Sequence, residues 1–271
     1  MRRLRDRILV YTVALMVSLW ILIPIALMFI AAFSDKSEYY RREVIIPRVY
    51  TTDNIEVFLR LGGLEALYRS FYVAILTIAI TMALATPAGY AIGRYLFRGR
   101  DALKLAYISF RVVPVVVIAV PLTRIYLSIG LHDSLLGIAL VHTALALPFA
   151  VLITSSVFAG IPRDLEEAGL VFGMSRLQVA LRITLPMALP GLVAAAMFTF
   201  IISYNEVFAA TVLALTQRTL PAFVLAAIGG GTAGAMPDPL KFAATVFLVV
   251  PAFLIMAYMR RYITVMWGYG R

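Results

Sequence analysis

Six long runs of apolar residues follow one another along the chain, separated by shorter polar segments. They cover residues 8–33, 70–93, 105–122, 135–158, 187–216 and 242–259. About 20 apolar residues in a helix cross the hydrocarbon core of a bilayer, and within lipid a helix satisfies its own backbone hydrogen bonds. The pattern therefore predicts an all-α membrane protein with six transmembrane helices in a single domain, residues 1–271.

Two uncharged segments allow other interpretations. The run at 8–33 follows four arginines, as the core of a secretory signal peptide would, but it is too long for such a core and lacks a small-residue cleavage site. We therefore interpret it as a retained membrane helix. Residues 220–237 contain four glycines and two prolines, which disfavour a helix, so we expect an external loop or a re-entrant segment there.

The positive charges indicate the orientation of the six predicted helices. Fourteen of the 24 Lys and Arg residues fall on one side of this arrangement and nine on the other, while Arg111 lies within the third run. Lys and Arg gather in cytoplasmic loops. The count predicts that both termini and residues 160–186 are cytoplasmic, in a multi-pass protein of the cytoplasmic membrane.

The composition is that of a membrane protein and excludes several other classes of protein. Hydrophobic residues make up 62% of the chain and charged residues 14%, with a mean hydropathy of +0.94. A soluble enzyme of this length could not bury so much apolar surface. The net charge of +10 is then explained by loops that face anionic lipid, and we expect no nucleic-acid partner.

The residues for most catalytic chemistry are missing. The chain has no cysteine and two histidines, which excludes disulfides and thiol nucleophiles and disfavours metal sites. It also lacks the G-x-x-x-x-G-K-[ST] loop that binds a nucleotide triphosphate, and its acids lie mostly in loops. We expect no catalytic residue, bound metal or cofactor in this chain.

A few polar residues interrupt the predicted spans. Glu206 is the only acid deep within one, and a carboxylate at that depth needs a cavity or a partner. With Tyr204 and Asn205 it forms a candidate substrate pathway that could bind a polyhydroxylated solute, although the same cluster could instead join helices. His142 is interpreted as a helix–helix hydrogen bond or a proton relay, and Arg111 as an internally paired charge or part of an ion pathway.

The sequence of residues 160–186 indicates regular secondary structure rather than a simple connecting loop. Pro162 suits the first position of a helix, and the acids that follow it favour the positive end of that helix. Gly173 then permits a turn, and Ser175 can cap a second short helix. The pattern predicts two helices joined by a glycine turn, which would insert into a soluble partner; a helix lying in the membrane interface is the alternative.

This segment resembles the inner loop of the membrane subunits of ATP-binding-cassette (ABC) importers. The residues that match the family pattern are Glu167, Ala168, Gly173, Ile183, Leu185 and Pro186. Gly169 departs from it, because the family usually has Ala there. The resemblance implies that the segment is a coupling helix seated in a groove of a cytoplasmic ATPase, with Asp164, Glu166, Glu167, Ala168, Gly173 and Ser175 as the coupling residues.

Further stretches resemble the second permease subunit of carbohydrate importers of the maltose/trehalose type. They are residues 88–94, 130–137, 148–149, 204–206 and 219–221. Tyr204 stands where this family commonly has Trp, and the chain lacks the family's usual Val-Lys-Gly ending.

The resemblance implies a type I ABC importer permease fold and a permease that moves a sugar, such as a di- or oligosaccharide, by alternating access. It also implies a homologous second permease subunit, two ATPase subunits that bind ATP and Mg, and an extracytoplasmic solute-binding protein. Three alternatives remain: an importer for another solute such as glycerol phosphate, an ion-coupled carrier that uses Glu206 and His142, and a membrane scaffold.

Overall fold

The computed structural model describes residues 2–40, 46–110, 114–228 and 237–268, and no β-strand occurs within these ranges. Five described helical segments are long and apolar enough to cross a membrane, and Val115–Ile129 is a shorter apolar helix. The chain divides into two compact units, residues 1–64 with 224–250 and residues 65–223 with 251–271. The predicted all-α class is confirmed.

The first unit contains the N-terminal helix and the first part of the last one. Its elements are α1 (Arg2–Ala32), α2 (Lys36–Tyr39), α3 (Asp53–Phe58), the π-helical turn η1 (Leu59–Gly63) and the beginning of α13 (Asp238–Gly268). The Asn54 amide donates to the carbonyls of Ala32 and Ser34 at 3.1 and 2.8 Å, which holds α3 to the end of α1. Phe58 packs on Phe247 of α13 with ring centroids 5.0 Å apart.

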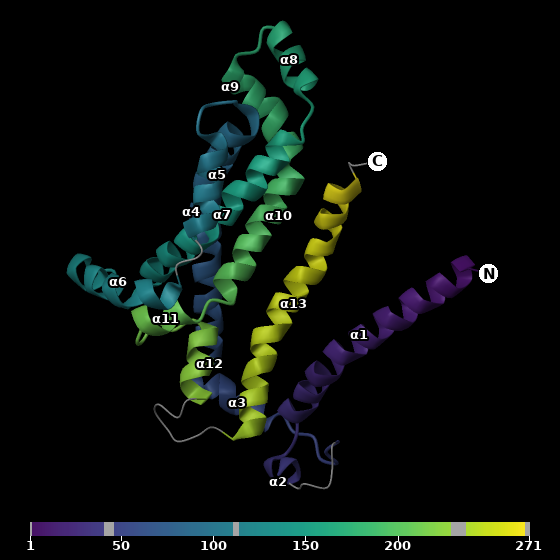
Figure 1. Cartoon of the computed structure of the whole chain (residues 1–271). Helices are drawn as coiled ribbons and strands as arrows, with labels where there is room; N and C mark the ends of the chain where they lie inside the picture. The colour runs from purple at the N-terminus through teal and green to yellow at the C-terminus, as the bar shows by residue number, and fades with distance from the viewer. Residues whose placement is uncertain (1, 41–45, 111–113, 229–236, 269–271) are drawn as a thin grey trace. The chain divides into compact units, whose positions relative to one another are not determined.

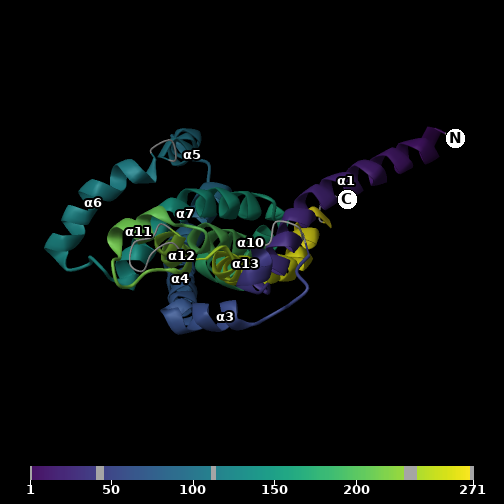
Figure 2. The same ribbon diagram turned by 90° about the horizontal axis from the view of Figure 1, so that it is seen from below.

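The second unit is built on three long helices that pack side by side: α4 (Leu64–Arg94), α7 (Leu135–Ala159) and α10 (Leu185–Tyr204) (Figure 1). Its shorter helices are α5 (Arg100–Ser109), α6 (Val115–Ile129), α8 (Arg163–Val171), α9 (Arg176–Val179), α11 (Phe208–Leu213) and the start of α12 (Leu220–Ile228), with a π-helical turn η3 (Ala180–Thr184) before α10. Seen from below, α6 and α11 lie next to one another beside α7 (Figure 2).

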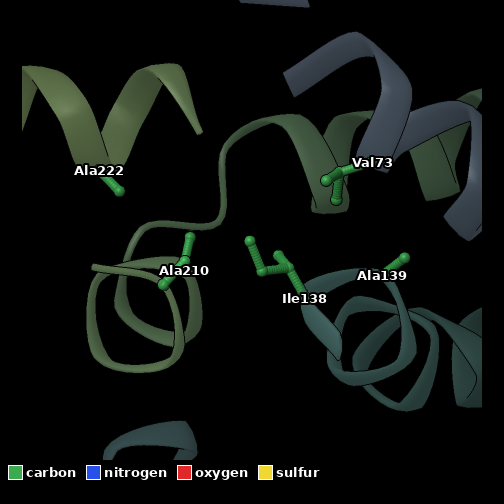
Figure 3. Close-up of a cluster of buried hydrophobic side chains, with 6 residues drawn as sticks. Val73, Ile138, Ala139, Ala210 and Ala222 are labelled. Carbon is green, nitrogen blue, oxygen red and sulfur yellow. The ribbon is translucent and has the colours of Figure 1, made fainter. Parts of the chain in front are cut away.

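Small side chains allow close packing at the first residues of α4 and α7, the ends that lie away from α8 and α9. A buried cluster joins Val73 of α4, Ile138 and Ala139 of α7, and three alanines of the α11–α12 region, namely Ala210, Ala214 and Ala222. Figure 3 shows Ile138 between Val73 and Ala210. Because lipid supplies no hydrophobic driving force between helices, close packing of such small residues is what stabilises the contact.

The third predicted span, 105–122, is wrong as one helix. The structure ends α5 at Ser109 and begins α6 at Val115, with Pro114 in extended conformation before it. Proline disfavours helical backbone at the residue that precedes it and has no N–H for a continuing helix. The apolar run continues through the break, so hydropathy alone does not show it. Arg111 lies outside the described residues.

The fifth predicted span, 187–216, also combines two helices. The helix α10 ends at Tyr204, and α11 starts at Phe208. Residues 220–237, expected as a loop or re-entrant segment, begin with the helix α12, whose Pro221 needs no N–H partner at a helix start. The glycine-rich part of that segment, 229–236, lies outside the described residues. The other four predicted spans each lie within or nearly within one helix.

Candidate functional site

The segment expected to couple to a partner forms two short helices at one end of the second unit, beyond the ends of α7 and α10 (Figure 1). Pro162 lies just before α8 rather than at its first residue. Gly173 has φ +84°, a left-handed conformation that side chains resist. Ser175 and Gln178 form a reciprocal capping box at the start of α9. The predicted helix, glycine turn and capped helix are therefore present.

The tip of this segment is an exposed apolar surface. Val171 and Phe172, at the end of α8, are 85% and 87% exposed, and Leu177 of α9 is 68% exposed. Asp164, Glu167, Ala168, Gly173 and Ser175 are exposed as well. Large apolar side chains this accessible, in a patch bordered by charges, mark an interaction surface. We refer to Val171, Phe172, Leu177 and Glu167 together as the α8–α9 tip.

Glu166 differs from the other predicted coupling residues because it points into the protein. Its carboxylate accepts from Arg94 Nε at 2.9 Å and from Thr184 Oγ1 at 2.6 Å, and its second oxygen lies 2.8 Å from Arg94 Nη2. Sequence reasoning did not identify Arg94 as a site residue; it counted Arg94 as a cytoplasmic positive charge and as the last residue of the resembled stretch 88–94. The available signals were that stretch and an arginine that ends an apolar run.

Gly169, where the resembled family usually has Ala, is explained by its surroundings. A Cβ atom there would lie 2.7 Å from Cδ1 of Ile183 and 3.0 Å from Cγ2 of Val179. Glycine thus allows α8 to lie directly against α9 and η3.

The predicted substrate-pathway residues do not share one site. Tyr204 is 1% exposed and packs against Phe71 and Phe200, with ring centroids 5.7 and 5.3 Å away. Asn205 is exposed, and its amide donates to the carbonyl of Ile201. Glu206 lies in the break between α10 and α11 rather than deep in a span. Their assignment to a substrate pathway stays a prediction.

Glu206 has a structural environment of its own. Its carboxylate accepts backbone N–H bonds from Phe208 and Ala209 at 2.9–3.1 Å, which caps the start of α11. It also lies 3.1 Å from Nε2 of His142 on α7, whose Nδ1 is 2.8 Å from Ser203 Oγ. These contacts join α7 to the end of α10, as the helix–helix interpretation expects, and they also place a titratable group beside His142, as a proton relay requires, so both interpretations of His142 stay predictions. Among the described residues, no three His, Asp or Glu side chains are grouped to hold a metal.

A second polar contact holds the opposite end of the unit together. Asp133, at φ +54°, accepts from the backbone N–H of Thr216 and Gln217 and from Thr216 Oγ1 at 2.6–3.1 Å. Burial raises the pKa of Asp133, but these hydrogen bonds to the charged form outweigh it, so the pKa lies below its ordinary value. Arg69 of α4 donates to the Thr216 carbonyl at 2.9 Å. The sequence carried no signal for this contact beyond the resembled stretch 130–137.

Comparisons with known proteins agree with this architecture. Residues 85–264 match the family described as binding-protein-dependent transport system inner membrane component. The trehalose transport system permease protein of Mycobacterium tuberculosis is 31% identical over 80% of each chain. The trehalose/maltose transport system permease protein of Thermococcus litoralis is 24% identical over 95% of this chain and 93% of its own.

Solved structures show the same fold. A chain of a bacterial ABC transporter involved in the import of the acidic polysaccharide alginate superimposes with a TM-score of 0.77, at 19% identity, over 95% of this chain and 97% of its own. A chain of the MetNI methionine ABC transporter gives a TM-score of 0.58 at 22% identity, over 80% of this chain and 98% of its own. With its apolar helices, the chain belongs to the family of binding-protein-dependent transport system inner membrane components, the multi-pass permease subunits of ABC importers.

Proposed function

We propose that this chain is one permease subunit of an ATP-driven importer that moves a sugar, of di- or oligosaccharide size, across the cytoplasmic membrane. The sugar assignment is supported by relatives named for trehalose and for trehalose/maltose transport, which align over most of both chains. The assembly contains a homologous second permease, two ATPase subunits that bind ATP and Mg, and an extracytoplasmic solute-binding protein.

The observation that carries this proposal is the α8–α9 tip. Phe172 and Val171 are almost fully exposed beside the exposed carboxylate of Glu167. A groove on the ATPase buries these apolar side chains, so closure of the two ATPase subunits on ATP pushes the tip toward its counterpart. Because packed helices switch between discrete arrangements rather than bend continuously, this push exposes the central cavity to one side of the membrane at a time.

The test is affinity purification of the tagged chain from its native membrane in mild detergent, followed by mass spectrometry. An ATPase and a second permease should co-purify, and a captured solute-binding protein would then identify the sugar through its bound ligand. A variant carrying Phe172→Asp and Val171→Asp should lose the ATPase and keep the second permease. Recovery of the intact chain alone, with proton-driven flux after reconstitution, would instead support an ion-coupled carrier.

A further inference from the structure

We propose that Arg94 is a positioning residue, which through Glu166 fixes the coupling helix α8 to the cytoplasmic ends of α4 and α7, so that the three move as one body. The inference deepens the proposed function and rests on it. Two adjacent acids then have different roles: Glu167 lies in the α8–α9 tip that contacts the ATPase, whereas Glu166 acts within the permease.

The geometry of the ion pair between Arg94 and Glu166 restricts the movement of both side chains. The Arg94 side chain is 4% exposed and that of Glu166 18%, and the guanidinium meets the carboxylate through two of its nitrogens at 2.9 and 2.8 Å. A guanidinium fork paired with a carboxylate fixes direction as well as distance. Thr184, fully buried before α10, donates to the same carboxylate at 2.6 Å. One carboxylate thus joins α8 to both α4 and the start of α10.

Arg94 also fixes the end of α7. Its Nη1 donates to the carbonyls of Phe158 and Ile161 at 3.2 and 2.7 Å. The Phe158 carbonyl also accepts from the Ile161 N–H at 3.3 Å, and Ile161 lies just beyond α7, so Arg94 adds a charged donor to the turn that follows α7, near the partial negative charge of the helix end. Removing the Glu166 charge would therefore leave an uncompensated cation between three elements.

The two long helices that Arg94 joins are packed too closely to slide. Gly89 and Gly93 lie four residues apart on α4, and Cβ atoms there would come within 2.0 Å of Thr154 Oγ1 and 2.6 Å of the Ser155 carbonyl on α7. Small residues at this spacing let membrane helices approach through their backbones. Thr154 Oγ1 has its shortest acceptor within α7, the Ala150 carbonyl at 2.7 Å, and lies 3.0 Å from the Ala85 carbonyl of α4, a distance that again requires the two helices to be close.

The other end of α4 reaches the opposite end of the unit. Ser70 Oγ accepts from the backbone N–H of Leu220 at 2.7 Å, and Arg69 donates to Thr216, which Asp133 also holds. The 31 residues of α4 span about 46 Å at 1.5 Å per residue. A displacement of α8 is therefore delivered along one helix to the segment that follows α11.

The natural absence of cysteine allows a direct measurement of this coupling. Spin labels are placed at Leu84→Cys on α4, 51% exposed, and at Leu165→Cys on α8, 40% exposed and outside the α8–α9 tip, in the intact purified complex in lipid nanodiscs. Pulsed electron spin resonance then gives the distribution of distances between them. Glu166→Gln, which keeps the shape of the side chain and removes its charge, should at least double the width of the distribution and lower ATP-driven sugar uptake about tenfold.

Glu167→Gln is the matched control, one residue away and exposed. It should lower uptake while it leaves the distance distribution unchanged. Should Glu166→Gln fail to accumulate in the membrane, the double variant Arg94→Met with Glu166→Leu replaces the pair with apolar side chains, which buried sites tolerate. It should accumulate, and it should broaden the distribution because the Phe158 and Ile161 carbonyls lose their hydrogen bonds to Arg94.

The distance distribution tests the positioning role, and the ATP-driven uptake tests the proposed function. A broadened distribution in Glu166→Gln or in the double variant supports the positioning role, even if the parent complex shows no ATP-driven uptake and the proposed function fails. An unchanged distribution in the variant that accumulates overturns the positioning role, whatever the uptake.

Discussion

In the proposed coupling segment, Gly173 is the residue whose backbone conformation most directly requires glycine. With φ +84° it occupies backbone space that costs a residue with a side chain about 1–2 kcal/mol. Gly173→Ala should therefore distort the turn between α8 and α9 and lower ATP-driven transport severalfold. Transport is measured in membranes that contain equal amounts of protein.

The control for this substitution is Gly160→Ala. Gly160 has φ −77° and space for a Cβ atom, with its nearest neighbours 3.6 Å away. It should transport like the parent. If Gly173→Ala also does so, the geometry of the turn is unimportant for coupling.

Asp133 gives a pH-dependent prediction. Because its pKa is lowered in the folded protein, its carboxylate contributes stability that is present above its unfolded pKa of about 3.9 and is lost as pH falls through the folded pKa. Asp133→Asn weakens the acceptor of three hydrogen bonds, at a cost of about 0.5–1 kcal/mol for this partly exposed group.

The check for Asp133 is thermal unfolding in detergent at two pH values. At pH 7 the Asp133→Asn variant should unfold about 1–4 °C below the parent. At a pH below the folded pKa this difference should shrink toward zero. An equal difference at both pH values would mean that the charge on Asp133 does not stabilise its contact with Thr216 and Gln217.

At the scale of whole elements, the packing of α4 on α7 depends on two glycines. Gly89→Leu inserts a side chain where Thr154 and the backbone of Ser155 already lie. The two helices must separate, so we expect loss of the folded protein from the membrane and a lower unfolding temperature. Ala83→Leu, at an exposed position on the same helix, is the matched control and should be neutral. Equal behaviour of the two variants would contradict the close approach.

The short helix α11 depends on its cap. Glu206→Ala removes the acceptor for the N–H groups of Phe208 and Ala209, which costs about 0.5–2 kcal/mol for a helix cap. Amide hydrogen exchange of residues 208–210 should become roughly two- to thirtyfold faster. Unchanged exchange rates at residues 208–210 would mean that Glu206 does not stabilise the start of α11, and would favour its assignment to the candidate substrate pathway.

The elements that sequence predicted well are those set by local pattern. Long apolar runs gave α1, α4, α7 and most of α13, and Gly173 with Ser175 gave the turn and cap of the coupling segment. The breaks at Pro114 and Glu206 were missed because apolar residues continue on both sides of each, so Asn205 and Glu206 were interpreted as polar groups within one helix rather than as its end. The Arg94–Glu166 pair joins residues 72 positions apart, and only the packing of α4 on α7 brings them together.

At the scale of the whole molecule, the second unit has the exposed apolar α8–α9 tip at one end, and the chain carries no nucleotide site motif of its own. In the proposed function, ATP is bound by partner subunits that the sequence indicates only through resemblance, and the α8–α9 tip is the surface that would meet one of them. The positive charges assign that tip to the cytoplasmic side, where ATP is available.

The most direct test of this account is sugar uptake by the complete complex in liposomes. With ATP on the side of the α8–α9 tip and the solute-binding protein on the other, labelled trehalose or maltose should accumulate, and a non-hydrolysable ATP analogue should abolish the uptake. Glu167→Gln should reduce it while the chain still inserts and assembles. Uptake that persists without ATP hydrolysis and follows a pH gradient would contradict the proposed ATP-driven importer.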